Sequence, residues 1–155
     1  TIELHQERFV GLERAARTLG VQLSALRITS SRDLEKTFGS MGQERPDGLL
    51  LFEQLIGPVR PDIALFALRH RVVTAAADWF FARGGGLLSY GPYVPDLYER
   101  AALYAGKLLQ GTRPSQLPVE EPTRFELVVN NATAHALGLT IPPSVLTRAD
   151  QVIDP

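Results

Sequence analysis

The fold is decided by residues 72–92, which read VVTAAADWFFARGGGLLSYGP. Residues 72–77 are apolar at nearly every position instead of at alternate ones, which is typical of a strand covered on both faces. Asp78 then provides a helix N-cap for residues 79–81, the three glycines form a turn, and residues 87–90 form a second strand. We therefore predict a strand–helix–strand unit with parallel strands.

The segments before this stretch continue the alternation of strands and helices. Residues 49–52 form an apolar run after a Pro-Asp-Gly turn and predict a central parallel strand, which is followed by a helix from near Pro58–Pro61 to His70. Further upstream, the spacing of apolar residues predicts a helix over 2–19, a strand over 21–28 and a helix over 30–41. We expect an α/β domain: an open parallel sheet with helices on both faces.

Downstream of residue 92 the chain changes character. A long helix is predicted over residues 95–110 and ends at Gly111, and its apolar stripe consists of Leu97, Ala101, Tyr104 and Leu108. Three spaced prolines then mark an extended connector, which leads to a strand over 125–129. Asn131 is expected to cap a short helix that ends at Gly138, and an irregular tail is expected from Pro142. The pattern indicates a chain that leaves its sheet and returns.

The composition limits the classes of function. Sixteen basic and seventeen acidic residues give a net charge of −1, so the strongly basic surface of a nucleic-acid-binding protein is absent. The chain has no cysteine, which excludes disulfides, thiolate metal sites and a cysteine nucleophile. No apolar run approaches the roughly 20 residues that a bilayer span needs. We therefore expect no nucleic-acid partner, no cofactor and no metal.

The sequence contains no motif that is typical of a catalytic site. The histidines at positions 5, 70 and 135 lie too far apart for metal-ligand spacing, and Gly84–Gly86 precede a strand and so indicate a turn instead of a phosphate loop. No Gly-x-Ser-x-Gly motif is present. A hydrolase or transferase would lack a nucleophile, so we expect the chain not to be an enzyme.

Candidate ligand-binding residues follow from the geometry of the predicted sheet. In open α/β sheets, ligands bind at the carboxyl ends of parallel strands. Six residues lie at these ends: Phe52, Glu53, Asp78, Trp79, Ser89 and Tyr90. Trp79 and Tyr90 can stack on a flat ligand, Glu53 or Asp78 can pair with an amine, and Ser89 or backbone N–H groups can bind a carboxylate. Two other roles remain open, namely core packing for Trp79 and helix capping for Asp78.

Residues 84–155 also resemble a known family. The resemblance is carried by GGLLSYGP at 85–92, KLLQG at 107–111, ALGLTIPPS at 136–144 and RAD at 148–150. These segments resemble the C-terminal half of the extracytoplasmic solute-binding proteins of ABC transporters, in the subgroup that includes predicted tryptophan- and tyrosine-type binders. Residues 1–83 fit the α/β periodicity of that family.

The resemblance implies a type I periplasmic-binding fold, in which two α/β lobes joined by three crossover strands close on a small solute. Residues 1–88 would form the second lobe without its first strand, residues 89–112 a crossover and a long helix of the first lobe, and residues 113–155 the return connector, strand and tail. The implied function is capture of a small organic solute, such as an amino acid or an aromatic compound, for a membrane permease in the periplasm or another extracytoplasmic space.

Two further expectations concern partners. A ligand-sensing lobe of a lac-repressor-type transcription regulator shares the same fold, although the absence of a basic helix-turn-helix segment disfavours it. The helix at 95–110 has an apolar stripe that belongs on a missing lobe, and the predicted sheet has an unpaired edge. Both features predict that the chain self-associates.

Overall fold

The computed structural model describes residues 2–25, 31–40, 46–51 and 60–155. In chain order the elements are α1 (Ile2–Leu19), α2 (Ser31–Ser40), β1 (Gly48–Leu51), α3 (Arg60–His70), β2 (Val73–Ala76), α4 (Trp79–Arg83), β3 (Leu88–Pro92), α5 (Val94–Leu109), a 3₁₀ turn (Pro114–Gln116), β4 (Phe125–Asn130), α6 (Asn131–Leu137), α7 (Pro143–Leu146) and β5 (Gln151–Ile153). None of the helices in these ranges combines the length and the apolarity needed to span a bilayer.

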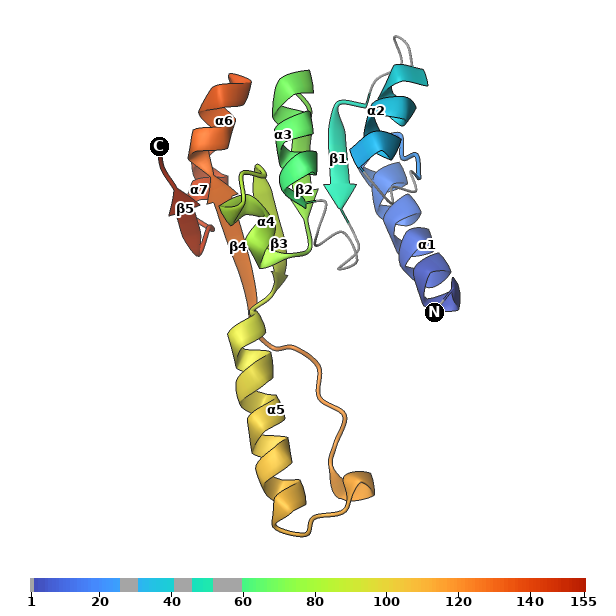
Figure 1. The fold of residues 1–155 in the computed structure, drawn as a ribbon, viewed down its shortest axis with the longest axis vertical. Coiled ribbons are helices and arrows are strands. Elements are labelled where there is room, and N and C mark those ends of the chain that lie inside the picture. The colour runs from blue at the N-terminus through green and yellow to red at the C-terminus, as the bar shows by residue number, and fades with distance from the viewer. Residues whose placement is uncertain (1, 26–30, 41–45, 52–59) are drawn as a thin grey trace.

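The strands form one sheet in the order β1-β2-β3-β4-β5, which confirms the α/β class (Figure 1). β1, β2 and β3 are parallel, and β5 is parallel to β4, but β4 is antiparallel to β3. The sheet is therefore mostly parallel, as predicted, and only the pairing of β4 with β3 departs from the predicted direction. The chain leaves the sheet at the end of β3 and returns at that same end, so the next strand has to run in the opposite direction.

Three local predictions are also wrong. Residues 21–25 form no strand, because Val21 is 58% exposed and has no neighbouring strand; residues 26–28 lie outside the described part of the chain. β1 pairs only with β2 in the described sheet, so it lies at an edge and not at the centre. The tail from Pro142 contains α7 and β5 and is not irregular.

The described core lies between β2, α3 and α4. Thr74 and Ala76 alternate with more exposed residues along β2, so one face of this strand is buried. The buried cluster consists of Ile63, Ala64, Phe66, Ala67, Val72, Ala76 and Phe81. The Phe81 ring occupies the space next to Gly86, where an added Cβ would lie 2.1 Å from a ring carbon. The glycine turn therefore lets α4 pack its central aromatic residue under the sheet.

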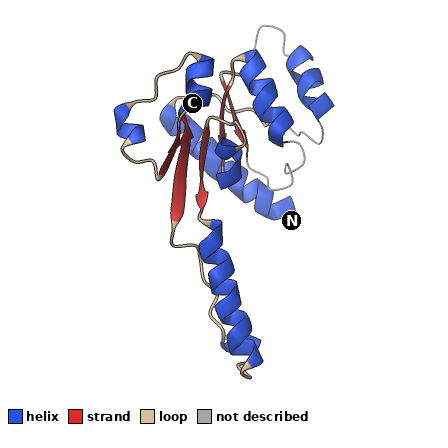
Figure 2. Cartoon of the chain, turned by 60° about the vertical axis from the view of Figure 1, so that its left-hand side comes forward, coloured by secondary structure: helices blue, strands red, loops and turns tan. Residues whose placement is uncertain are grey.

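Helix α5 and its connector extend away from the sheet (Figures 1 and 2). None of the residues of α5 is buried, and Tyr98 and Leu109 are 73% and 90% exposed. The connector packs along the stripe predicted to face another lobe, where the Tyr104 hydroxyl donates to the Pro118 carbonyl at 2.7 Å. A second apolar face, which carries Tyr98 and Leu109, therefore has no covering element in the described chain.

Candidate functional site

The predicted ligand edge exists and coincides with the start of the projecting helix. Ala76 at the end of β2 pairs with Ser89, so residues 90–92 of β3 continue beyond the end of β2. α5 begins two residues after β3, and β4 returns to the same edge, where Phe125 pairs with Pro92. The residues that follow β2 therefore lie next to the two segments that link the sheet to α5.

Asp78 and Trp79 lie at this edge at the junction of β2 and α4. Asp78 is the N-cap of α4, and its Oδ1 accepts a hydrogen bond from the Phe80 amide at 2.9 Å. The capping role weighed for Asp78 is thus confirmed, with the carboxylate half-buried at the edge. Trp79 is the first residue of α4. Phe52 and Glu53, predicted for the same edge, lie outside the described residues.

Ser89 is turned into the protein instead of toward the edge. It is completely buried, and its Oγ accepts a hydrogen bond from the Ala82 amide at 2.8 Å. The Asn130 side-chain amide donates to the carbonyl of the same Ala82 at 2.8 Å, while its Oδ1 accepts from the Thr133 amide. Asn130, and not the predicted Asn131, is therefore the N-cap of α6. Ser89 and Asn130 together fix the position of α4.

Tyr90 is exposed and forms an aromatic pair that sequence reasoning missed. Its ring is 57% exposed and stacks on the ring of Phe125, with centroids 5.8 Å apart and planes at 24°. Phe125 is itself 45% exposed. The two residues are 35 positions apart and meet only because β4 pairs with β3. The pair presents an apolar, flat surface at the point where both strands leave the sheet.

The two linking segments are joined just beyond the sheet. The Tyr93 amide donates to the Arg124 carbonyl at 3.0 Å, and the Arg124 guanidinium lies 4.0 Å from the centre of the Tyr93 ring. Arg124 Nη1 is also 3.6 Å from Asp96 Oδ1 in the first turn of α5. These three residues, here called the crossover clasp, were not singled out by the sequence patterns.

An ionic group on the α4 side of the sheet connects α4, β4 and β5. The Arg83 guanidinium lies 3.2 Å from Glu126 Oε1, and Arg83 Nε donates to Gln151 Oε1 at 2.9 Å. Glu126 is only 8% exposed, and its Oε2 has no hydrogen-bond partner among the described residues. This group holds the last strand against the helix whose N-terminus carries Asp78.

A second ionic group attaches the connector to α5. Arg100 donates to Glu120 Oε2 at 2.6 Å and to Thr123 Oγ1 at 3.1 Å. The Tyr104 hydroxyl and the Arg100 guanidinium beside Glu120 hold the pKa of that carboxyl below its usual value of 4.5. Partial burial and the neighbouring Glu120 carboxylate raise the pKa of Tyr104 above 10. Glu120 is thus engaged in holding the connector against α5.

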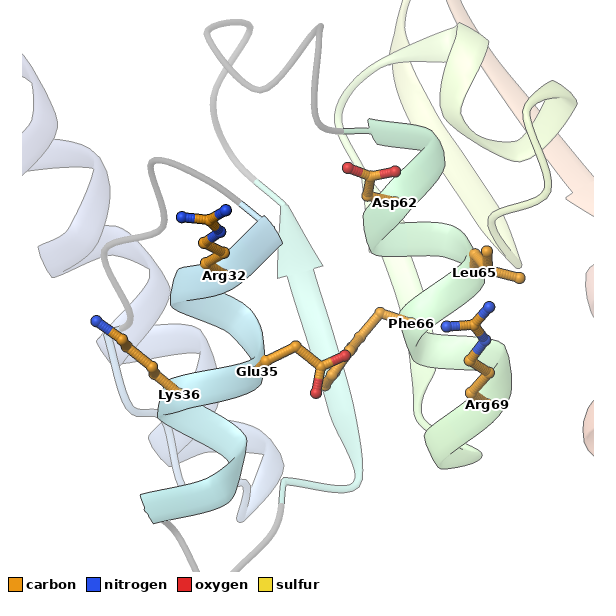
Figure 3. Close-up of a pocket in the computed structure, with 7 residues that line it drawn as sticks. All are labelled: Arg32, Glu35, Lys36, Asp62, Leu65, Phe66 and Arg69. Atoms are coloured by element: carbon orange, nitrogen blue, oxygen red, sulfur yellow. The ribbon is translucent and has the colours of Figure 1, made fainter.

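Of the candidate residues that the structure describes, Asp78, Trp79 and Tyr90 lie at the edge, and none of them lines either of two hollows on the described surface. One hollow, of about 460 Å³, separates α2 from α3 (Figure 3) and is lined by Arg32, Glu35, Lys36, Asp62, Leu65, Phe66 and Arg69. The other, of about 170 Å³, lies between α5 and the connector. In the described part of the chain, no group of three histidine or acidic side chains could hold a metal ion. The edge offers an aromatic surface, a carboxylate and a guanidinium, which suit non-covalent binding of a small molecule.

Comparison with protein families gives a match over nearly the whole chain. Residues 7–153 match the family described as ABC transporter substrate binding protein. A search of curated proteins gives no significant match.

Solved structures with the same fold include proteins from three bacteria. A conserved domain protein from Vibrio cholerae aligns with a TM-score of 0.83 at 21% identity, and an ABC domain from Streptococcus pneumoniae, solved in complex with L-Trp, aligns with 0.83 at 23%. The ligand-free, open structure of CD0873 from Clostridium difficile, a substrate binding protein with adhesive properties, aligns with 0.66 at 21%. The alignments cover 96%, 96% and 97% of this chain and 50% of each of the others, so the chain spans about half their length.

Proposed function

Because the chain belongs to the ABC transporter substrate binding protein family, we propose that it forms one wall of a site that captures a small organic solute. The wall is the edge where β2 and β3 end, and a second lobe supplies the opposite wall. One observation carries this proposal: both linking segments leave the sheet beside Asp78 and Tyr90, and they lead into a helix with no buried residue. A binding protein that closes by hinge motion needs a site next to its linking segments.

We assign roles to the edge residues from their surroundings. The exposed Tyr90–Phe125 pair provides a flat apolar surface for stacking. The Asp78 carboxylate at the N-terminus of α4 is placed to accept a hydrogen bond from an amine. Further contacts are proposed for Trp79, which comes after β2 in the sequence, and for Phe52 and Glu53, which come after β1. Ser89 is proposed to support the site indirectly, by holding α4 in place, because its hydroxyl already accepts a hydrogen bond from the Ala82 amide. The Streptococcus pneumoniae relative, solved with L-Trp, supports an aromatic amino acid as the first solute to test.

The division of the chain follows from the same proposal. Residues 1–88 form one lobe, residues 89–112 cross over and form a helix that packs on the other lobe, and residues 113–155 return. The chain covers half the length of the structures it matches, and the uncovered face of α5 supports this assignment. In the whole protein the captured solute is delivered to the permease of an ABC importer in an extracytoplasmic compartment. The regulator alternative is set aside, because the family match extends over residues 7–153.

The proposal is tested by following the amide resonances of the 155-residue chain during titration with L-Trp, L-Phe and L-Ala. We expect L-Trp and L-Phe to shift the amides of Ala77–Asp78 and Tyr90–Gly91 in the millimolar range, because a single wall leaves about half of a small solute in water. Tyr90→Ala should weaken this binding several-fold. Tyr98→Ala is the matched control, since Tyr98 is exposed on α5 away from the edge. Shifts confined to other surfaces, or equal binding by both variants, would contradict the proposal.

A further inference from the structure

The crossover clasp contains a cation that the proposed site does not yet use. Arg124 lies immediately before β4, and 60% of its side chain is exposed. Its guanidinium is held in place by the Tyr93 ring at 4.0 Å, and its backbone carbonyl accepts from the Tyr93 amide. A planar cation stacked on an aromatic ring keeps its N–H groups directed outward from its rim. Arg124 is therefore positioned before any ligand arrives.

The Arg124 guanidinium pairs with one carboxylate, but at a distance too long for a hydrogen bond. The nearest carboxylate oxygen, Asp96 Oδ1, is 3.6 Å from Nη1, which is longer than the 2.7–2.9 Å or so of a charge-assisted hydrogen bond. Within the described ranges the Arg124 guanidinium makes no hydrogen bond. An exposed ion pair with this geometry contributes little to stability. Another anion can therefore displace the Asp96 carboxylate from the Arg124 guanidinium at a small cost in free energy. Arg124 thus has its full donor capacity available.

The backbone places Arg124 on the same side of the sheet as Asp78. Gly91 pairs with Glu126, and an added Cβ on Gly91 would point at the Ala77 carbonyl, next to Asp78. Side chains two residues apart along a strand share a face. Tyr93 follows Gly91 by two residues and Arg124 precedes Glu126 by two, so the stacked pair extends that face past the end of the sheet.

We propose that Arg124 binds an anionic oxygen group of the captured solute, a carboxylate or a phosphate, through its guanidinium fork. Both groups match the paired N–H donors of arginine. The inference rests on the proposed function, because the solute has to occupy the edge between Asp78 and the crossover clasp. It narrows the solute class to molecules that carry an anionic oxygen group, and it makes Asp96 the competing anion that the solute displaces.

The test uses three probes that each carry a phenyl ring: benzoate, phenyl phosphate and benzamide. Each is titrated into the 155-residue chain while the Arg124 Nε–H resonance and the edge amides are followed by NMR. We expect at least one of the two anions to shift the Arg124 resonance and to bind roughly fivefold or more tightly than neutral benzamide. A stronger response to benzoate identifies a carboxylate, and a stronger response to phenyl phosphate identifies a phosphate. Asp96→Asn should raise the affinity for the anion by removing its competitor.

Variants separate Arg124 from a general effect of charge. Arg124→Gln should abolish the preference for the anion, Arg124→Lys should keep part of it, and the exposed Arg148→Gln, placed after α7, should leave it unchanged. Unchanged amide shifts in the core would show that the Arg124 variants fold. Binding of benzamide and both anions at the edge with equal affinity, or a preference that survives in Arg124→Gln, would overturn the role of Arg124 alone. No response of the edge to any of the probes or to aromatic amino acids would overturn the proposed function together with this inference.

Discussion

A Cβ atom built on Gly91 would lie 2.2 Å from the carbonyl oxygen of Ala77, a distance at which no side chain fits. β3 therefore passes directly against the backbone at the end of β2. Asp78 and Tyr90, which flank this contact, are held at a fixed separation because backbone atoms cannot yield as a flexible side chain does. The close approach of Gly91 to Ala77 is thus the feature that places the two sides of the candidate site next to each other.

Gly91→Ala should destabilise the chain by about 1–3 kcal/mol, the usual cost of overpacking, because either β3 or the β2–α4 junction has to move. Gly106→Ala provides the matched control. An added Cβ at Gly106 would meet no neighbouring element within 4 Å, so this change within the last turn of α5 should stabilise by about 0.5–1 kcal/mol. Urea unfolding followed by circular dichroism measures both. A Gly91→Ala variant as stable as the original chain would disprove the close contact.

Ser89→Ala should cost about 1–3 kcal/mol, because the buried Ala82 amide would lose the Ser89 hydroxyl that accepts its hydrogen bond. The exposed Ser144→Ala should change the free energy of unfolding by less than about 0.5 kcal/mol. The same two variants should be measured for solute affinity. If Ser89 contacts the solute directly, Ser89→Ala would lower the affinity without lowering stability, and the supporting role assigned to it would be wrong.

The attachment of the connector to α5 should weaken in acid. The pKa of Glu120 is below 4.5 when the Tyr104 hydroxyl and Arg100 lie beside it, so the ionised form is favoured in the attached state. This stabilisation is fully present above pH 4.5 and is lost as the pH falls through the lowered value. The amide resonances of Val119, Glu120, Glu121 and Thr123 should report the release. Glu120→Gln should remove this pH dependence, whereas Glu121→Gln should titrate like the original chain.

The 155-residue chain should self-associate through α5. Tyr98 and Leu109 are eleven residues apart, which places them on one face of the helix, and both are largely exposed. We predict a mass above 17.0 kDa by light scattering at tens of micromolar. Replacing Tyr98 and Leu109 by glutamate should restore the monomer mass. Leu103→Glu alters another largely exposed leucine on a different face of α5 and should leave the association unchanged. A monomeric original chain would refute this prediction.

The sequence predicted well where neighbours in the chain decide the structure. The Asp78 cap, the parallel pairing of the strands around it and the turn at Gly84–Gly86 all follow from short-range patterns, and the structure has each of them. The reversal of β4 was missed, because residue patterns within a strand do not encode its direction. It follows from the path of the chain, which leaves and re-enters the sheet at one edge.

The missed site residues have a single physical explanation. Phe125 meets Tyr90, and Arg124 meets Tyr93, across more than thirty residues of intervening chain. Each looks ordinary in its own segment, and only strand pairing gives it a partner. The prolines and the strand at 125–129 did predict that the chain returns, so the signal for a second linking segment was present. The register that aligns these side chains could come only from the structure.

The central claim is that the edge formed by Asp78, Tyr90 and the crossover clasp is half of a solute site. It is tested most directly by calorimetry of one identified solute with the 155-residue chain and with a protein that also contains the second lobe. We predict micromolar affinity for the two-lobe protein and millimolar affinity for the chain alone, since losing about half of a free energy near −8 kcal/mol has that effect. In both proteins Tyr90→Ala should weaken binding. Equal micromolar affinities, or binding that is insensitive to Tyr90→Ala in both proteins, would contradict the account.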